Sequence, residues 1–118
     1  MQDIESRKDI EILVSTFYNK VRHDPLLAPV FAHVDWVHHL PVMVDFWSSI
    51  LLGDMRYQGN PFQKHIGLPI SAAHFEQWLK LFISTVDDGF AGPRADEARL
   101  RAKSIAGLFQ HKLGLTTP

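Results

Sequence analysis

Apolar residues recur every three or four positions along most of the chain, the spacing that places side chains on one face of an α-helix. The first such stripe covers about four turns and consists of Ile10, Leu13, Val14, Phe17, Tyr18 and Val21. Ser6, with Asp9 three residues later, is a typical helix start. The Asp24-Pro25 pair ends the pattern, so we expect a helix between Ser6 and Asp24. Asp24 and Pro25 then favour a short second element through Phe31.

Three further stretches show the helical spacing. The first begins near Asp35 and ends at Gly53, and we expect Pro41 to kink or end it, because a proline removes one backbone hydrogen bond. Another runs from a Ser71 cap to Gly89, and the last runs from about Arg94 to Leu113. No stretch alternates with a period of two residues, so the predicted class is all-α.

Composition excludes several classes of protein. The 118 residues suit one domain, over residues 1–118, and contain no cysteine, which excludes disulfides, thiolate catalysis, iron–sulfur ligation and covalent haem attachment through C-x-x-C-H. The formal net charge is −1, so we expect no nucleic-acid partner and no attraction to an anionic membrane. The N-terminus lacks the apolar core of a signal peptide. No apolar run approaches membrane-spanning length, so we expect a cytoplasmic protein.

Seven histidines, eight phenylalanines, three tryptophans and two tyrosines are many for a chain of this size. The aromatic residues either fill a core or line a pocket for a flat apolar ligand. The spacings H-E-x-x-H and repeated Glu-x-x-His, which hold zinc or paired iron ions on helices, do not occur. His38 and His39 are adjacent and point about 100° apart on a helix. A site with several protein ligands to one metal is therefore weakly supported.

A haem needs fewer ligands from the protein than a bare metal ion does, because the porphyrin already supplies four iron ligands. The chain has to add only one axial histidine and an apolar pocket. His65 lies on a single turn between Pro61 and the Gly67–Pro69 segment. His39, Tyr18 and Trp78 lie on helices with apolar faces. Taken singly, each of these four residues also fits an ordinary core or surface role.

Taken together, four stretches resemble the truncated haemoglobins, and within them group III. These stretches are FYNKVRHDPLLAPVF (residues 17–31), HHLPVMVDFWSSILLG (38–53), YQGNPFQKHIGLP (57–69) and HFEQWLKLF (74–82). The resemblance covers roughly residues 8–113. It implies a two-over-two helical sandwich, a shortened form of the globin fold. The absence of any Gly-Gly pair also fits group III.

The resemblance also implies individual roles. His65 would be the proximal iron ligand, Tyr18 the distal tyrosine, His39 the distal histidine and Trp78 the distal tryptophan. Phe31 would pack against the haem face. Further residues that we expect to line a non-covalent haem b are Phe46, Trp47, Tyr57, Phe62 and Phe82, with Arg56 or Lys64 as a partner for a haem propionate.

These roles predict a protein that reversibly binds dioxygen, carbon monoxide and nitric oxide at a pentacoordinate iron. Tyr18, Trp78 and His39 are candidate hydrogen-bond donors to the ligand, which suits oxygen or nitric oxide chemistry better than bulk oxygen transport. Nitric oxide dioxygenase or peroxidase-like activity is an alternative, as is a haem-free helical interaction domain. We expect a monomer served by an unidentified reductase.

Overall fold

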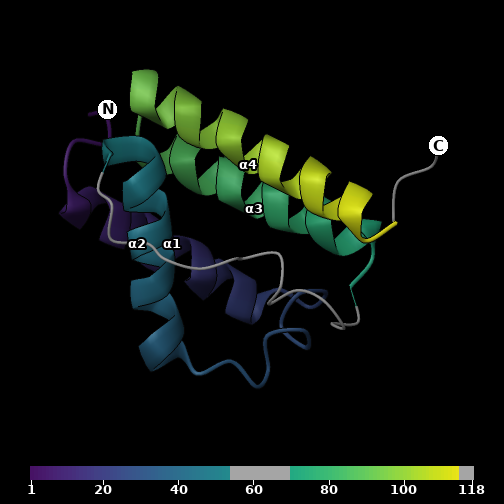
Figure 1. Cartoon of the computed structure of the whole chain (residues 1–118). Helices are drawn as coiled ribbons and strands as arrows, with labels where there is room; N and C mark the ends of the chain where they lie inside the picture. The colour runs from purple at the N-terminus through teal and green to yellow at the C-terminus, as the bar shows by residue number, and fades with distance from the viewer. Residues whose placement is uncertain (54–69, 115–118) are drawn as a thin grey trace.

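The computed structural model describes residues 1–53 and 70–114, and within these ranges it contains four α-helices and no strand (Figure 1). The helices are α1 (Arg7–His23), α2 (Trp36–Leu52), α3 (Ala72–Gly89) and α4 (Pro93–Lys112). In Figure 1, α3 and α4 lie side by side as an antiparallel pair, and α2 crosses α1; α1 also packs against α3. The predictions of an all-α class and of a two-over-two sandwich are confirmed.

The helices begin and end at the residues that the sequence singles out. The side chain of Ser6 accepts a hydrogen bond from the Asp9 amide at 3.4 Å, and the Asp9 carboxylate accepts one from the Ser6 amide at 3.2 Å, which completes a capping box. Asp35 caps α2 by accepting from the Val37 amide at 3.2 Å. Gly53 ends α2 with a φ of +73°, a left-handed conformation that glycine adopts without strain.

The segment between α1 and α2 forms a series of turns rather than the short helix that its sequence suggests. Asp24 nevertheless caps it as predicted, because its carboxylate accepts from the amides of Leu26 and Leu27 at 2.9 and 3.0 Å. The Gln77 amide donates to the second carboxylate oxygen of Asp24 at 2.6 Å. This contact fixes the turn to α3 and thereby places Phe31 beside the cavity described below.

The expectation that Pro41 ends the helix is wrong, because α2 continues through it from Trp36 to Leu52. The hydrogen bond that proline cannot donate would go to the carbonyl of Val37, four residues earlier. Val37 lies in the first turn and is 80% exposed, so water can solvate this carbonyl. The cost of the missing bond is therefore small, and His39 stays within a regular helix.

Small residues allow α4 to pack closely on its neighbours. The stripe of α4 that is buried consists of Ala95, Ala98, Ala102, Ala106 and Phe109. Phe109 completes this face near the end of the helix. Leu108 is exposed instead.

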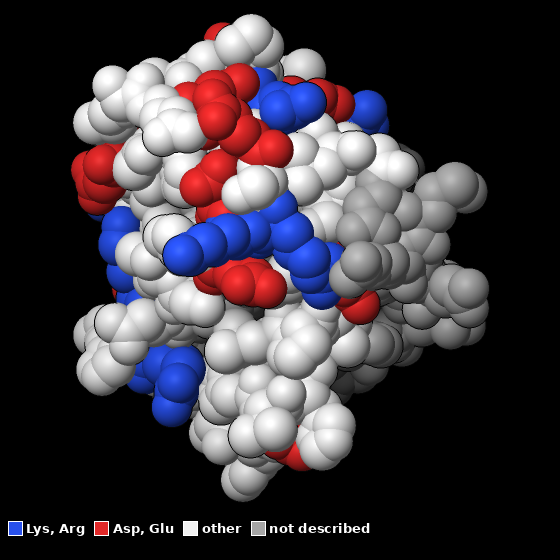
Figure 2. Space-filling model, turned by 90° about the vertical axis from the view of Figure 1, so that its left-hand side faces the viewer, with Lys and Arg blue, Asp and Glu red and all other residues white. Residues whose placement is uncertain are grey.

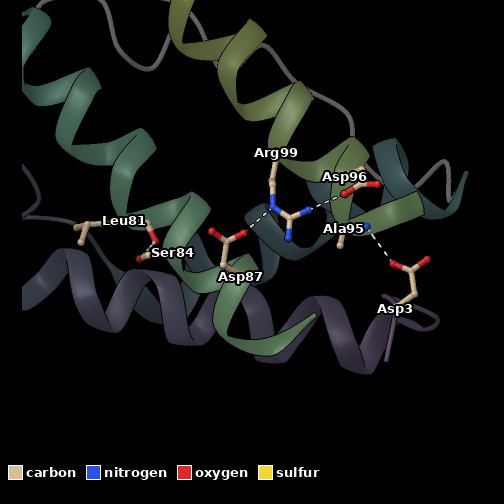
Figure 3. A network of polar contacts seen from close by, with 7 residues as sticks. All are labelled: Asp3, Leu81, Ser84, Asp87, Ala95, Asp96 and Arg99. Carbon is tan, nitrogen blue, oxygen red and sulfur yellow. Dashed lines mark hydrogen bonds and ion pairs between the residues drawn. The ribbon is translucent and has the colours of Figure 1, made fainter. Parts of the chain in front are cut away.

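Polar contacts hold the α3–α4 hairpin at its closed end (Figure 3). The Arg99 guanidinium bridges Asp87 on α3, at 2.7 Å, and Asp96 on α4, at 2.8 Å. The Asp3 carboxylate accepts from the Ala95 amide at 2.9 Å, so the N-terminal segment caps α4. Gly92 precedes α4 with a φ of +139°, and a Cβ atom there would lie 2.5 Å from the Asp3 carboxyl carbon. Glycine is therefore required at this position.

The surface offers no field of one charge sign on the face shown in Figure 2, where acidic and basic side chains are interspersed. Within residues 1–53 and 70–114, no helix combines the length and the apolar character needed to cross a membrane.

Candidate functional site

A largely apolar cavity lies among α1, α2, α3 and α4 and the turn segment before α2. Its empty space is about 930 Å³, part of which is continuous with solvent. The described residues that line it are Tyr18, Leu27, Val30, Phe31, His39, Met43, Phe46, Trp47, Ile70, His74, Phe75, Trp78, Ile105, Ala106 and Phe109. The wall is aromatic and aliphatic apart from five side chains that carry a nitrogen or oxygen atom, namely Tyr18, His39, Trp47, His74 and Trp78. Such a wall suits a large, flat, apolar ligand.

Six of the residues singled out by the sequence meet at this cavity. Tyr18, His39 and Trp78 come from α1, α2 and α3, which are far apart in the chain. The other three are the aromatic residues Phe31, Phe46 and Trp47. The fold therefore brings the predicted polar trio and half of the predicted apolar lining into one place.

Tyr18 is the most enclosed of the three polar residues. It is only 5% exposed, and aromatic rings surround it. Their centroids lie 4.8 Å away for Phe17, 6.2 Å for Phe31, 5.2 Å for Trp36 and 5.3 Å for His39. These contacts fix the phenol ring at the cavity wall, so that its hydroxyl group has a defined position.

The Tyr18 hydroxyl is a protonated donor. Burial raises the pKa of Tyr18 far above its ordinary value, and a hydrogen bond from the Trp78 side chain lowers it by a smaller amount. An indole nitrogen can only donate, so Trp78 N–H donates to the tyrosine oxygen. The tyrosine O–H then remains to donate elsewhere.

His39 completes the polar end of the cavity. Its ring lies 5.3 Å from Tyr18 and 5.4 Å from Trp36, in edge-to-face contact with both. Because α2 is unbroken at Pro41, the imidazole is held at the wall by a regular helix rather than swung outward to solvent.

Phe82 occupies a different position from the one expected. It is fully buried in the core and stacks on Trp47 at 4.7 Å and on Trp78 at 5.7 Å. Both of these tryptophans line the cavity. Phe82 therefore supports the wall from behind.

Several residues at the cavity were not predicted to be part of a site. Phe75, Ile105 and Phe109 line it together with Ile70 and Ala106, and these five residues belong to one hydrophobic cluster. Their helical spacing marks them as apolar face residues, but spacing alone does not tell a core face from a cavity wall. The second unpredicted feature is His74, whose signal in the sequence is its position three residues after the Ser71 cap.

Five predicted residues lie outside the described ranges. They are His65, Tyr57 and Phe62, together with the two propionate candidates, Arg56 and Lys64. Within the described ranges, no group of three His, Cys, Asp or Glu side chains is placed to hold a metal ion. The described part of the cavity therefore supplies apolar walls and hydrogen-bond donors. These features fit a haem, which brings its own iron and four of that iron's ligands.

Comparisons with known proteins agree with this geometry. Residues 2–109 match the family model described as bacterial-like globin. The chain is 34% identical over 115 residues to the group 3 truncated haemoglobin ctb of Campylobacter jejuni, covering 92% of this chain and 91% of that protein. It is 36% identical over 79 residues to the group 1 truncated haemoglobin GlbN of Nostoc commune, covering 66% of this chain and 67% of that protein.

A solved structure extends the similarity to the whole fold. The crystal structure of group III truncated haemoglobin from Campylobacter jejuni superposes with a TM-score of 0.86 at 33% sequence identity. The match covers 99% of this chain and 97% of that one.

Proposed function

Because this chain belongs to the bacterial-like globin family and, within it, to the group III truncated haemoglobins, we propose that it reversibly binds dioxygen, nitric oxide and carbon monoxide at a pentacoordinate haem b. Haem-based ligand binding follows from the family itself. The proposal adds the identity of the ligands, the coordination state, the type of haem and the roles of individual residues.

The observation that carries the proposal is the buried, protonated Tyr18 hydroxyl at the wall of an apolar cavity. A donor in such a place stabilises a ligand that gains negative charge when it binds, and a charge-assisted hydrogen bond contributes about 1.5–3 kcal/mol. Trp78 N–H occupies the tyrosine oxygen, so the O–H of Tyr18 is directed to a second acceptor. His39 stands beside it as a further donor.

The haem, when bound, supplies a ferrous iron that coordinates the ligand. By the family resemblance we assign the proximal iron ligand to His65. The aromatic residues Phe31, Phe46 and Trp47 exclude water from the cavity, which strengthens the hydrogen bond from Tyr18 because the local dielectric constant is low.

Strong donors favour retention of dioxygen over its rapid release, because most affinity differences appear in the dissociation rate. We therefore propose oxygen or nitric oxide chemistry rather than bulk transport. Nitric oxide dioxygenase or peroxidase-like turnover is the second candidate, and the observation that favours it is the same fixed pair of Tyr18 and Trp78. Nitric oxide dioxygenase turnover would leave the iron oxidised and needs a reductase to return it to the ferrous state, whereas peroxidase-like turnover would need a reducing co-substrate. We propose that the protein acts as a monomer in the cytoplasm.

Absorption spectra of the purified protein test the proposal. We expect a Soret band that shifts on reduction with dithionite and again on addition of carbon monoxide. In His65→Ala this band is lost or altered, whereas in His111→Ala, which removes an exposed histidine from α4, it is unchanged. The unliganded ferrous spectrum reports whether the iron is pentacoordinate or whether His39 binds it. A protein without a Soret band after addition of haemin leaves the haem-free interaction domain as the better interpretation.

A further inference from the structure

His74 is a further polar residue of the cavity wall, and neither the predicted roles nor the proposed function uses it. It lies on the first turn of α3, lines the cavity and is half-buried, so part of the residue is accessible to solvent. Its Nδ1 atom lies 2.9 Å from the Ser71 backbone nitrogen and 2.9 Å from the Ser71 hydroxyl oxygen. These contacts fix the ring at the start of the helix.

The contact with the Ser71 backbone determines the tautomer of His74. A backbone N–H can only donate, so Nδ1 is an acceptor and carries no proton. The neutral imidazole then carries its proton on Nε2. In this state Nε2 has no lone pair for a metal, and the ring offers a single N–H donor. His74 is thus suited to bind an oxygen acceptor rather than an iron atom.

The position of His74 separates it from the other polar groups. It precedes Trp78 by four residues, which is about 6 Å along α3. Tyr18, Trp78 and His39 form one polar group, held together by ring contacts and by the hydrogen bond from Trp78 to Tyr18. Within the described ranges, His74 makes no ring contact with that group, and its chain neighbour Phe75 belongs to the apolar cluster with Ala106 and Phe109.

The chemistry of haem b, the proposed ligand of the cavity, indicates which acceptor the His74 N–H binds. A haem b is apolar except for two carboxylates, and burying a carboxylate without a partner is costly, so these groups belong where the cavity meets solvent. The described residues that line the cavity include no lysine and no arginine. We propose that His74 is a haem-carboxylate-binding residue, whose Nε2–H donates to one propionate while Nδ1 holds the start of α3. This inference rests on the proposed haem binding.

Two substitutions separate the propionate contact from the helix cap. His74→Leu removes both functions. His74→Glu keeps the cap, because glutamate three residues after serine forms a standard capping box and its charge is favourable at a helix start. It also places a negative charge beside the carboxylate. Ala73→Glu is the matched control, because it adds the same charge to the same turn at an exposed residue that does not line the cavity.

The measurement is the rate at which the full-length ferric protein loses haem to an excess of apomyoglobin, with either haem or haem dimethyl ester. We expect His74→Leu to lose haem about fivefold faster than wild type and His74→Glu about tenfold faster or more, while Ala73→Glu remains within twofold. With the dimethyl ester, which has no carboxylate charge, all four proteins should agree within about twofold. Thermal unfolding of haem-free His74→Glu at or above the wild-type temperature shows that the cap is retained.

Two results would overturn the inference. One is wild-type haem retention in His74→Glu, and the other is an equally large effect of this variant on the dimethyl ester. Both leave the proposed function intact, because each requires a protein that binds haem. A wild-type protein that takes up no haem overturns the proposed function and this inference together.

Discussion

Removal of the Tyr18 hydroxyl tests the central element of the site. Tyr18→Phe deletes one oxygen atom and keeps the ring, so the packing against Phe17, Phe31 and Trp36 is retained. The deleted group is the acceptor for Trp78 N–H and, in our proposal, the donor to the bound ligand. The variant therefore changes the polarity of the cavity without opening it.

The size of the effect follows from the burial of the hydroxyl. A hydrogen bond to a partly negative ligand contributes about 1.5–3 kcal/mol, which corresponds to an affinity change of about 10- to 150-fold. Because Tyr18 is only 5% exposed, water is poorly placed to replace the lost donor. We therefore expect the dioxygen affinity to fall by a factor within this range of about 10- to 150-fold, and we expect the loss to appear as faster dissociation.

Stopped-flow displacement of dioxygen by carbon monoxide measures this rate. We expect Tyr18→Phe to release dioxygen at least tenfold faster than wild type. Carbon monoxide gains little negative charge on binding, so its own release rate should change less than about threefold, and this comparison serves as the control. Trp78→Phe leaves the Tyr18 O–H in place but removes its orienting partner, so its effect should be smaller, about two- to fivefold. An unchanged dioxygen rate in Tyr18→Phe, or equal changes for the two gases, would refute the donor argument.

Three further predictions concern stability and are checked by urea or thermal unfolding. Partial burial raises the pKa of Asp3, but backbone N–H donors at the start of α4 outweigh it and hold the pKa below the ordinary value. The charged carboxylate therefore stabilises the fold above about pH 4, and this contribution is lost as the pH falls. We expect Asp3→Asn to lower the free energy of unfolding by about 0.5–1 kcal/mol at pH 7 and to leave it unchanged near pH 2. Ser48 is fully buried, and its hydroxyl has no hydrogen-bond partner among the described residues. Because alanine removes this unpaired group, Ser48→Ala should raise the Tm by about 4–8 °C. A lower Tm would show that the hydroxyl is hydrogen-bonded in the folded protein. Gly92→Ala should destabilise by more than 1 kcal/mol because its Cβ meets Asp3, whereas Gly107→Ala, in open space within α4, should stabilise by about 0.5–1 kcal/mol.

The helices could be predicted because their signals are local. Ser6, Asp35, Gly53 and Ser71 each mark a helix end through contacts within a few residues, and all four have the expected role. Pro41 misled the prediction because the cost of a helical proline depends on the solvation of the carbonyl four residues earlier. That exposure is a property of the folded surface and is not visible in a local pattern.

The site could be predicted only in part. Periodicity identified Tyr18 and Trp78 as members of apolar faces, and the family resemblance gave them their roles. No local signal indicates that the Trp78 indole donates to the Tyr18 oxygen, because the two residues lie 60 positions apart in the sequence. His74 was missed for the opposite reason. Its position three residues after Ser71 indicates a contact at the helix start, but this local signal does not indicate that His74 also lines the cavity.

The polar side chains that the proposals use fall into two sets, and this division would give a bound haem a defined orientation. Tyr18, His39 and Trp78 are the proposed donors to a ligand of the iron. His74 lies one helical turn away on α3 and is the proposed donor to a haem carboxylate. Since Trp78 and His74 share one face of the same helix, their separation is fixed by the helical rise rather than by flexible segments. Rotation of the haem within its plane would remove the carboxylate from His74 while leaving the iron in place. The propionate contact and the distal donors should therefore be separable by mutation: His74→Glu changes haem retention with little effect on dioxygen release, and Tyr18→Phe does the reverse.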